Sequence, residues 1–253
     1  MEAVETRSEN VVVIDEQFYI PQLNRTRRIW LYLPNDYHTS FKRYPVVYMQ
    51  DGQNLFDQAT AFGDEWAVDK TLNAMLAETI IVGIDNSEHR LTEYNFHHHP
   101  EYGEGEGDRY IRFIVEILKL FVDANYRTRP ERQHTVVAGS SMGGLISLYG
   151  AIYYPEVFGK AGVFSPSLWL VADWMEELIA RAAKNGQHPQ QFYFYGGAKE
   201  GSNMVEHLQF VANSLKAFPS YKVHVSVDPE GEHSEYHWRK VFPEFYIWLA
   251  EVQ

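Results

Sequence analysis

The chain has 253 residues, a length typical of one α/β domain that can bury about three quarters of its unfolded surface. Its formal charge of -12 at pH 7 disfavours a nucleic acid or an anionic membrane surface as a partner, because their phosphate groups would be repelled. The absence of cysteine excludes disulfide bonds and thiol chemistry.

Two leading segments, Val11–Ile20 and Arg27–Leu33, are rich in β-branched and aromatic residues and predict two strands. From residue 44 onward, short apolar runs typical of buried strands alternate with segments whose apolar residues have helical spacing. This alternation favours a mostly parallel central sheet with helices on both faces. In chain order, we predict further strands at 44–49, 79–84, 136–138, 161–164, 191–195 and 223–227, and helices at 66–76, 110–122, 145–154, about 169–183, 204–217 and 236–251.

The segment at 85–107 interrupts this pattern because it is long, polar and irregular. Loops of such length in compact domains are usually functional or disordered. We therefore predict a single domain over residues 1–253 with an active-site loop at about 85–107. The stretch Gly103–Gly107 is glycine-rich but acidic and would repel phosphate. The run His97-His98-His99 predicts no metal site, since neighbouring side chains of an extended segment point in different directions.

The stretch Gly139-Ser140-Ser141-Met142-Gly143 lies between an apolar strand and a helix-like pattern, and it has the spacing Gly-x-Ser-x-Gly. This spacing is typical of a nucleophile elbow, a sharp turn from strand to helix with a serine at its tip. Ser141 occupies the middle position and is the predicted nucleophile, with Ser140 as the alternative. The flanking glycines fit because side chains would collide in so tight a turn.

A serine nucleophile of this type is followed along the chain by an acid and then by a histidine. His233 lies on the loop between the last predicted strand and the terminal helix, so it is the predicted general base. Glu200 follows the strand at 191–195 and is the predicted acid that orients the imidazole. Glu206 and Asp228 are rivals for the role of the acid.

The second oxyanion donor of such a site is expected in the loop after the third strand. In this chain that loop is Asp51-Gly52-Gln53-Asn54. We predict that the backbone N–H groups of Gln53 and Met142 form the oxyanion hole. This chemistry requires neither a cofactor nor a metal.

Around these motifs, a longer pattern comprises Tyr44–Asp57, Tyr126–Thr128, Ala138–Gly144, Tyr154–Phe158, Ser165–Trp169, Gly197–Gly201 and Gly231–Glu235 with Trp238. These stretches resemble the sequence blocks of an esterase family of α/β hydrolases that includes enterochelin-esterase-like, feruloyl and acetyl-xylan esterases. The resemblance extends from Ile29 to Leu249 and implies an α/β-hydrolase fold. One departure is Gln50, where that family often has a histidine, and it affects contacts behind the triad.

The predicted function is hydrolysis of a small-molecule carboxylic ester by a serine esterase through an acyl-enzyme. Sugar, phenolic and siderophore-type esters are the expected substrate classes. The predicted substrate contacts are Asp51, Tyr94, His98 and Trp169, which can hydrogen-bond to or stack on such groups. The alternatives are acyl transfer on the same triad, a catalytically silent binding module, and a peptidase, for which no peptide-binding feature is visible.

The N-terminal residues 1–10 are charged and lack the apolar stretch of a signal peptide. No run approaches the roughly 20 apolar residues of a membrane span. The expected location is therefore the cytoplasm, and a membrane is not an expected partner. The sequence is compatible with a homo-oligomer.

Overall fold

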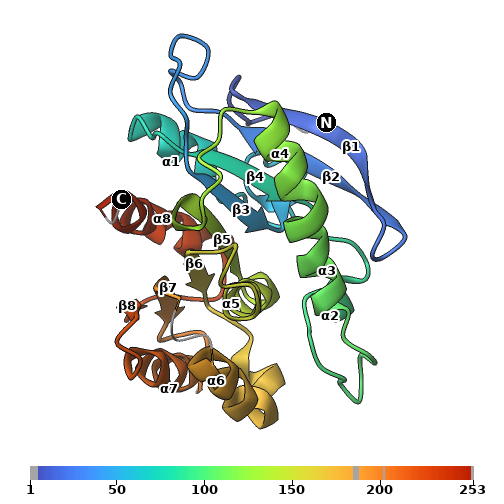
Figure 1. Cartoon of the computed structure of the whole chain (residues 1–253). Coiled ribbons are helices and arrows are strands. Elements are labelled where there is room, and N and C mark those ends of the chain that lie inside the picture. The colour runs from blue at the N-terminus through green and yellow to red at the C-terminus, as the bar shows by residue number, and fades with distance from the viewer. Residues whose placement is uncertain (1–4, 185–187, 202, 252–253) are drawn as a thin grey trace.

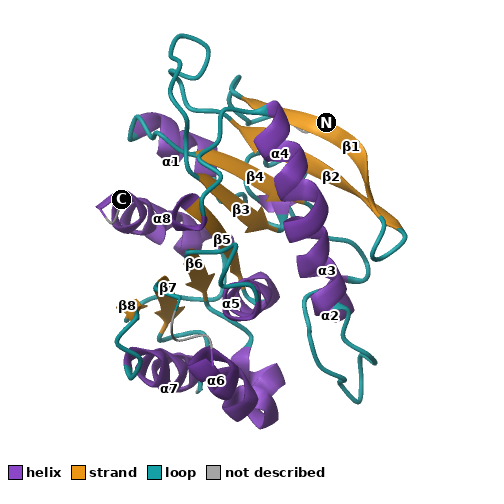
Figure 2. Ribbon diagram, in the orientation of Figure 1, coloured by secondary structure: helices purple, strands orange, loops and turns teal. Residues whose placement is uncertain are grey.

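The computed structural model describes residues 5–184, 188–201 and 203–251, in which the chain forms an eight-stranded mixed sheet (Figures 1 and 2). The strands are β1 (Val11–Ile20), β2 (Arg25–Tyr32), β3 (Val46–Gln50), β4 (Ile80–Ile84), β5 (Thr135–Ser140), β6 (Lys160–Phe164), β7 (Gln190–Gly197) and β8 (Tyr221–Asp228). Their order across the sheet is β1-β2-β4-β3-β5-β6-β7-β8. β2 is antiparallel to both β1 and β4, whereas all other neighbours are parallel.

Helices cover both faces of this sheet, as the alternation of strands and helices predicted. On one face, α1 (Val68–Ala74) packs beside α8 (Glu235–Glu251) (Figure 1). The opposite face carries α3 (Gly107–Phe113), α4 (Lys119–Asn125), α5 (Met142–Tyr153), α6 (Met175–Lys184) and α7 (Met204–Lys216), and a short α2 (Arg90–Glu93) precedes α3.

Within the described residues, no helix is both long and apolar enough to cross a bilayer.

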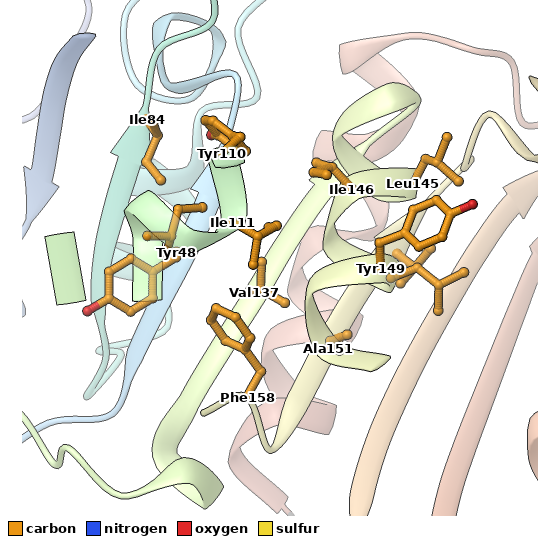
Figure 3. Close-up of a cluster of buried hydrophobic side chains, with 14 of the residues drawn as sticks. Tyr48, Ile84, Tyr110, Ile111, Val137, Leu145, Ile146, Tyr149, Ala151 and Phe158 are labelled. Carbon is orange, nitrogen blue, oxygen red and sulfur yellow. The ribbon is translucent and has the colours of Figure 1, made fainter. Parts of the chain in front are cut away.

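Alternate side chains of the central strands form two core layers, one on each face of the sheet. Tyr48 of β3 and Val137 of β5 lie in the layer beneath α3 and α5, together with Ile111 and Phe158 (Figure 3). Val47, the neighbour of Tyr48, lies in the layer beneath α1 and α8. Because side chains along a strand alternate between faces, a strand that is covered on both faces reads as an unbroken apolar run.

Two of the predicted helices differ from the observed ones. The helix predicted at 110–122 is part of a longer one, since α3, a π-helical stretch (Ile114–Leu118) and α4 follow one another from Gly107 to Asn125. The helix predicted at 169–183 begins as a 3-10 helix (Leu168–Trp174) and continues as α6. Both helices lie where they were predicted. The π-helical stretch is internal to the first, and the 3-10 helix forms the start of the second.

The segment at 85–107 is more ordered than its polar composition predicted. It contains α2, and the carboxylate of Glu93 is fully buried. Arg25 Nη1 lies 2.8 Å from Glu93 Oε1, and Arg27 pairs with the other carboxylate oxygen. A buried carboxylate requires such partners, and both arginines come from β2, far away in the sequence. The predicted irregular loop is therefore anchored to the sheet by buried charge.

The C-terminal ends of the parallel strands converge at one edge of the sheet. β3 ends at Gln50, β5 at Ser140, β7 at Gly197 and β8 at Asp228. Each of these residues directly precedes a loop that carries predicted site residues. This edge of a parallel sheet is where ligands of open α/β proteins are usually bound.

Phe245 joins α8 to the sheet and should contribute strongly to stability. Its ring is 1% exposed, and its centroid lies 5.3 Å from that of Phe164 and 5.4 Å from that of Tyr193. We expect Phe245→Ala to lower the free energy of unfolding by about 3–5 kcal/mol, because it leaves a cavity. Urea unfolding measures this loss, with Ile247→Ala on the exposed face of α8 as a control that costs less than about 1 kcal/mol. Equal losses in the two variants would contradict the prediction.

Candidate active site

The backbone at Ser141 has the strained conformation expected at the tip of a nucleophile elbow. Its φ is 58° and its ψ is -123°, a region that costs a residue with a side chain about 1–3 kcal/mol. The Ser141 N–H donates to the carbonyl oxygen of Phe164 at 2.9 Å, which fixes the turn to the end of β6. A Cβ at Gly139 would lie 2.7 Å from the Gly143 oxygen. Glycine is therefore required where β5 meets α5.

His233 and Glu200 form a close hydrogen bond. The Nδ1 of His233 lies 2.7 Å from Oε2 of Glu200, whose side chain is fully buried, while the His233 side chain is 39% exposed. A carboxylate at this position accepts the proton of Nδ1, which leaves Nε2 of the neutral ring as the basic nitrogen. The second carboxylate oxygen accepts hydrogen bonds from Ser165 Oγ at 2.7 Å and from Gly197 N at 2.5 Å.

The two rivals of Glu200 lie elsewhere. Glu206 is exposed in the first turn of α7. Asp228 accepts a hydrogen bond from the backbone of Glu230 and pairs with Lys240 at 3.3 Å. Neither contacts His233, so the geometry favours Glu200 as its partner.

Ser141 and His233 face the same cleft. Ser141 Oγ shares a hydrogen bond with Ser167 Oγ at 3.3 Å, and the described residues show none between Ser141 and His233. In enzymes without bound substrate, catalytic hydrogen bonds are often long and tighten only in the complex. The base and the nucleophile are therefore adjacent to one cavity without being locked together.

The cleft has two lobes that meet at Ser141, His233 and Arg90. We call them the Trp169 lobe, of about 500 Å³, and the Phe62 lobe, of about 690 Å³. Further residues of the Trp169 lobe are Leu91, Tyr102, Met142, Pro166, Ser167, Leu168, Leu170, Glu200, Gly201, Asn203, Met204 and His207, and those of the Phe62 lobe are Asp51, Gln53, Asn54, Thr60, Asn86, Ser140, Glu235 and Trp238. An ester bound at Ser141 can thus extend in two directions.

The two predicted oxyanion donors come from opposite sides of this cleft. Met142 is the first residue of α5, so its N–H has no acceptor within the helix. Gln53 is the middle residue of a 3-10 turn (Gly52–Asn54) and lines the Phe62 lobe. A Cβ at Gly52 would lie 2.8 Å from the backbone of β4, so glycine lets this turn pack directly against the sheet.

Asp51, a predicted substrate contact, is occupied by protein groups. Arg90 Nε and Nη2 donate to its two carboxylate oxygens at 2.7 and 2.8 Å, and Asn86 Nδ2 donates at 2.6 Å. Burial alone would lower the pKa of Arg90, but the Asp51 carboxylate raises it overall. The pair joins the 3-10 turn Gly52–Asn54, which we call the oxyanion turn after the predicted donor Gln53, to α2. Asp51 therefore holds two segments of the site together, and Arg90 compensates its negative charge.

Of the other predicted substrate contacts, only Trp169 faces the cleft, where its side chain is 59% exposed. Tyr94 is fully buried, with its ring 5.1 Å from that of Tyr110, so direct contact with a substrate is excluded in this structure. His98 is exposed and lies 2.9 Å from Glu104, outside the lining of both lobes. From the same segment, Tyr102 lines the Trp169 lobe instead.

Sequence reasoning missed Arg90, which lies at the junction of the two lobes. A signal was present, because Arg90 is the only lysine or arginine between residues 71 and 108. A single permanent cation in an acidic stretch indicates a specific carboxylate partner. Phe62 and Glu235 carried no comparable signal, since an exposed aromatic and one further glutamate are ordinary in this composition.

The histidine run at 97–99 lies outside the lining of both lobes, and two of its rings pack on aromatic side chains. His97 stacks on Trp174 with ring centroids 4.5 Å apart, and burial lowers the pKa of His97. His99 stacks on Tyr102 at 4.5 Å. In the described part of the chain, no three His, Asp or Glu side chains gather in a way that could hold a metal ion.

The Asp51–Arg90 pair should behave as one energetic unit. Arg90→Ala is expected to lower the free energy of unfolding by about 3–5 kcal/mol, because it leaves a buried carboxylate without its cation. Adding Asp51→Asn removes that charge, so the double variant should lose less than the sum of the single losses. Denaturant unfolding measures the cycle, with exposed Arg109→Ala as a control that changes stability by less than about 0.5 kcal/mol. Strict additivity would contradict the coupling.

Known proteins match this chain over most of its length or over a part of it. A family model described as "Putative esterase" matches residues 20–249. The Bacillus subtilis protein YbbA is 28% identical over 239 residues, which cover 88% of this chain and 92% of that protein. The iron(III) salmochelin esterase of Escherichia coli is 32% identical over 161 residues, which cover 62% of this chain and 35% of that enzyme.

The fold is also found in solved structures. The siderophore hydrolase EstA from Aspergillus nidulans superposes with a TM-score of 0.80 at 18% identity, and the alignment covers 96% of this chain and 95% of that one. At this identity the likeness shows the fold alone, and it confirms the predicted α/β-hydrolase class. Because the family model matches nearly the whole length, the chain belongs to the esterase family of α/β hydrolases.

Proposed function

We propose that this chain is a serine esterase that hydrolyses a carboxylic ester through an acyl-enzyme intermediate. The observation that carries the proposal is the buried Glu200 carboxylate 2.7 Å from His233 Nδ1, beside a cleft that His233 and Ser141 both line. A histidine held in this way has a basic Nε2 available for the serine hydroxyl. The strained turn at Ser141 supports the same role.

In the first step, Ser141 Oγ attacks the ester carbonyl while His233 Nε2 takes the hydroxyl proton. The carbonyl oxygen becomes an oxyanion, which the N–H groups of Met142 and Gln53 would stabilise. As the tetrahedral intermediate collapses, the bond to the alcohol oxygen breaks and His233 transfers its proton to that oxygen. The free alcohol leaves, and the acyl group remains on Ser141.

In the second step, water replaces the alcohol. His233 takes a proton from the water as its oxygen attacks the acyl carbon, and the same two N–H groups bind the second oxyanion. Collapse breaks the bond to Ser141 Oγ, which recovers its proton from His233, and the carboxylic acid leaves. Glu200 keeps its hydrogen bond to Nδ1 and stabilises the imidazolium that forms in each step.

For the substrate, we propose an ester of siderophore, phenolic or sugar type. The salmochelin esterase and the siderophore hydrolase among the relatives act on siderophores by name, although the matched region is only about a third of the former enzyme. The exposed ring of Trp169 in the cleft offers a surface for an aromatic group. A chain with a net charge of -12 favours a neutral ester over a highly anionic one.

Replacement of the nucleophile tests the reaction itself. Ser141→Ala should abolish hydrolysis of a short-chain nitrophenyl ester and labelling by a fluorophosphonate, because it removes the hydroxyl that would form the acyl-enzyme. An unchanged melting temperature would show that the fold is intact. The matched control is Ser140→Ala, which should retain labelling. Activity retained by the Ser141 variant would disprove the proposal.

Replacement of the acid tests the hydrogen bond that carries the proposal. Glu200→Gln should lower kcat by several orders of magnitude, on the order of 10⁴, because an amide no longer stabilises the imidazolium and can favour the wrong tautomer. Glu206→Gln, the exposed rival, should leave kcat within about twofold. A large loss in the Glu206 variant with a small one in the Glu200 variant would reverse the assignment.

A further inference from the structure

The Phe62 lobe contains a carboxylate that the proposed mechanism does not use. Glu235 is the first residue of α8, two residues after His233, and it lines this lobe. Its Oε1 accepts a hydrogen bond from Asn54 Nδ2 at 3.1 Å. Among the described residues Glu235 has no cation within ion-pair distance, whereas Asp51 is paired with Arg90. Burial, and then the charge of nearby Asp51, raises the pKa of Glu235.

An exposed aromatic ring lies in the same lobe. Phe62 is 88% exposed, although its backbone N–H is fixed by a hydrogen bond to Asn54 Oδ1 at 2.9 Å. Asn54 therefore connects the oxyanion turn to both Phe62 and Glu235. The hydroxyl of Thr60 donates to the Gln53 carbonyl in the same wall at 2.7 Å. The lobe thus combines an apolar ring with a carboxylate acceptor and side-chain amides.

This combination selects for the charge of the group that enters. An anion would be repelled by Glu235. Arg90 lines the same lobe, but its guanidinium is paired with both carboxylate oxygens of Asp51 and offers no free charge to an entering group. A neutral group that donates several hydrogen bonds suits Glu235, because a carboxylate accepts bonds from hydroxyl groups and these charge-assisted bonds are strong. The apolar face of a saturated ring can pack on Phe62 at the same time.

We propose that the Phe62 lobe binds a neutral polyhydroxylated ring of the ester, a sugar or a cyclitol, whose hydroxyl groups donate to Glu235 while its apolar face packs on Phe62. This assignment rests on the proposed esterase function and adds the chemistry of one half of the substrate. The lobe volume of about 690 Å³ accommodates such a ring. The other half of the ester then extends toward Trp169.

The test compares two esters of one phenolic acid, its glucose ester and its methyl ester, by the ratio of their kcat/KM values. Glu235→Ala should lower this ratio on the order of tenfold to a hundredfold, because a charged hydrogen-bond acceptor is lost. Glu235→Gln should lower it less, since an amide oxygen still accepts bonds from a hydroxyl and from Asn54. Phe62→Ala should lower the ratio as well. Controls are Phe41→Ala and Glu206→Gln, both exposed outside the lobes, which should leave it unchanged.

A second pair of esters covers the opposite orientation, with the hydroxylated ring in the acyl half. It consists of the methyl esters of quinic acid and of cyclohexanecarboxylic acid. A ratio that depends on Glu235 in either pair supports the assignment, and independence in both pairs overturns it. For a choline ester, kcat/KM could fall as much in Glu235→Gln as in Glu235→Ala while neither ratio changes. That result would mark a cation site instead and overturn the assignment. If the wild type hydrolyses no ester and resists a fluorophosphonate, the proposed function fails first.

Discussion

The conformation of Ser141 is the constraint on which the rest of the site depends. A positive φ at a residue with a side chain is held only where the surroundings leave no alternative. Here β5 lies between β3 and β6, and the Ser141 N–H is bound to the last residue of β6. Gly139 and Gly143 remove the atoms that would force this turn open. The hydroxyl therefore projects at the sheet edge where the other loops converge.

Compensation of charge organises the loops around that turn. The chain is strongly acidic, yet its most buried carboxylates near the site have specific partners. Asp51 is paired with Arg90 and Glu93 with two arginines of β2, whereas Glu200 is held by hydrogen bonds from His233 and Ser165. Each pair joins segments that are distant in sequence. Buried ion pairs add little net stability but cost much when one partner is lost, so they fix the relative positions of loops that share no core.

Most of the fold could be predicted from the sequence because apolar runs and helical spacing report directly on burial. The strands and the elbow at Ser141 depend on local patterns of this kind. Glu200 and His233 could be placed on loops by their position after strands, and the structure brings their side chains together. The wall of the cleft could not be predicted in the same way. Tyr94 and His98 lie in the right segment, but the Tyr94 ring packs inward on Tyr110 of α3, and His98 lies at the surface beside Glu104.

In the proposed mechanism, the histidine loop separates the catalytic base, His233, from a substrate contact, Glu235, by only two residues. His233 is held from behind by Glu200, and Glu200 by Ser165, which also accepts a hydrogen bond from Trp238 at 2.9 Å. Among the described residues, Glu235 makes no hydrogen bond to this chain and accepts one from Asn54 instead. We therefore expect a substitution of Glu235 to change which ester is preferred while His233 keeps its position. Its link through Asn54 does reach the oxyanion turn. In the proposed mechanism, recognition of one half of the ester and stabilisation of the transition state therefore depend on the same amide side chain.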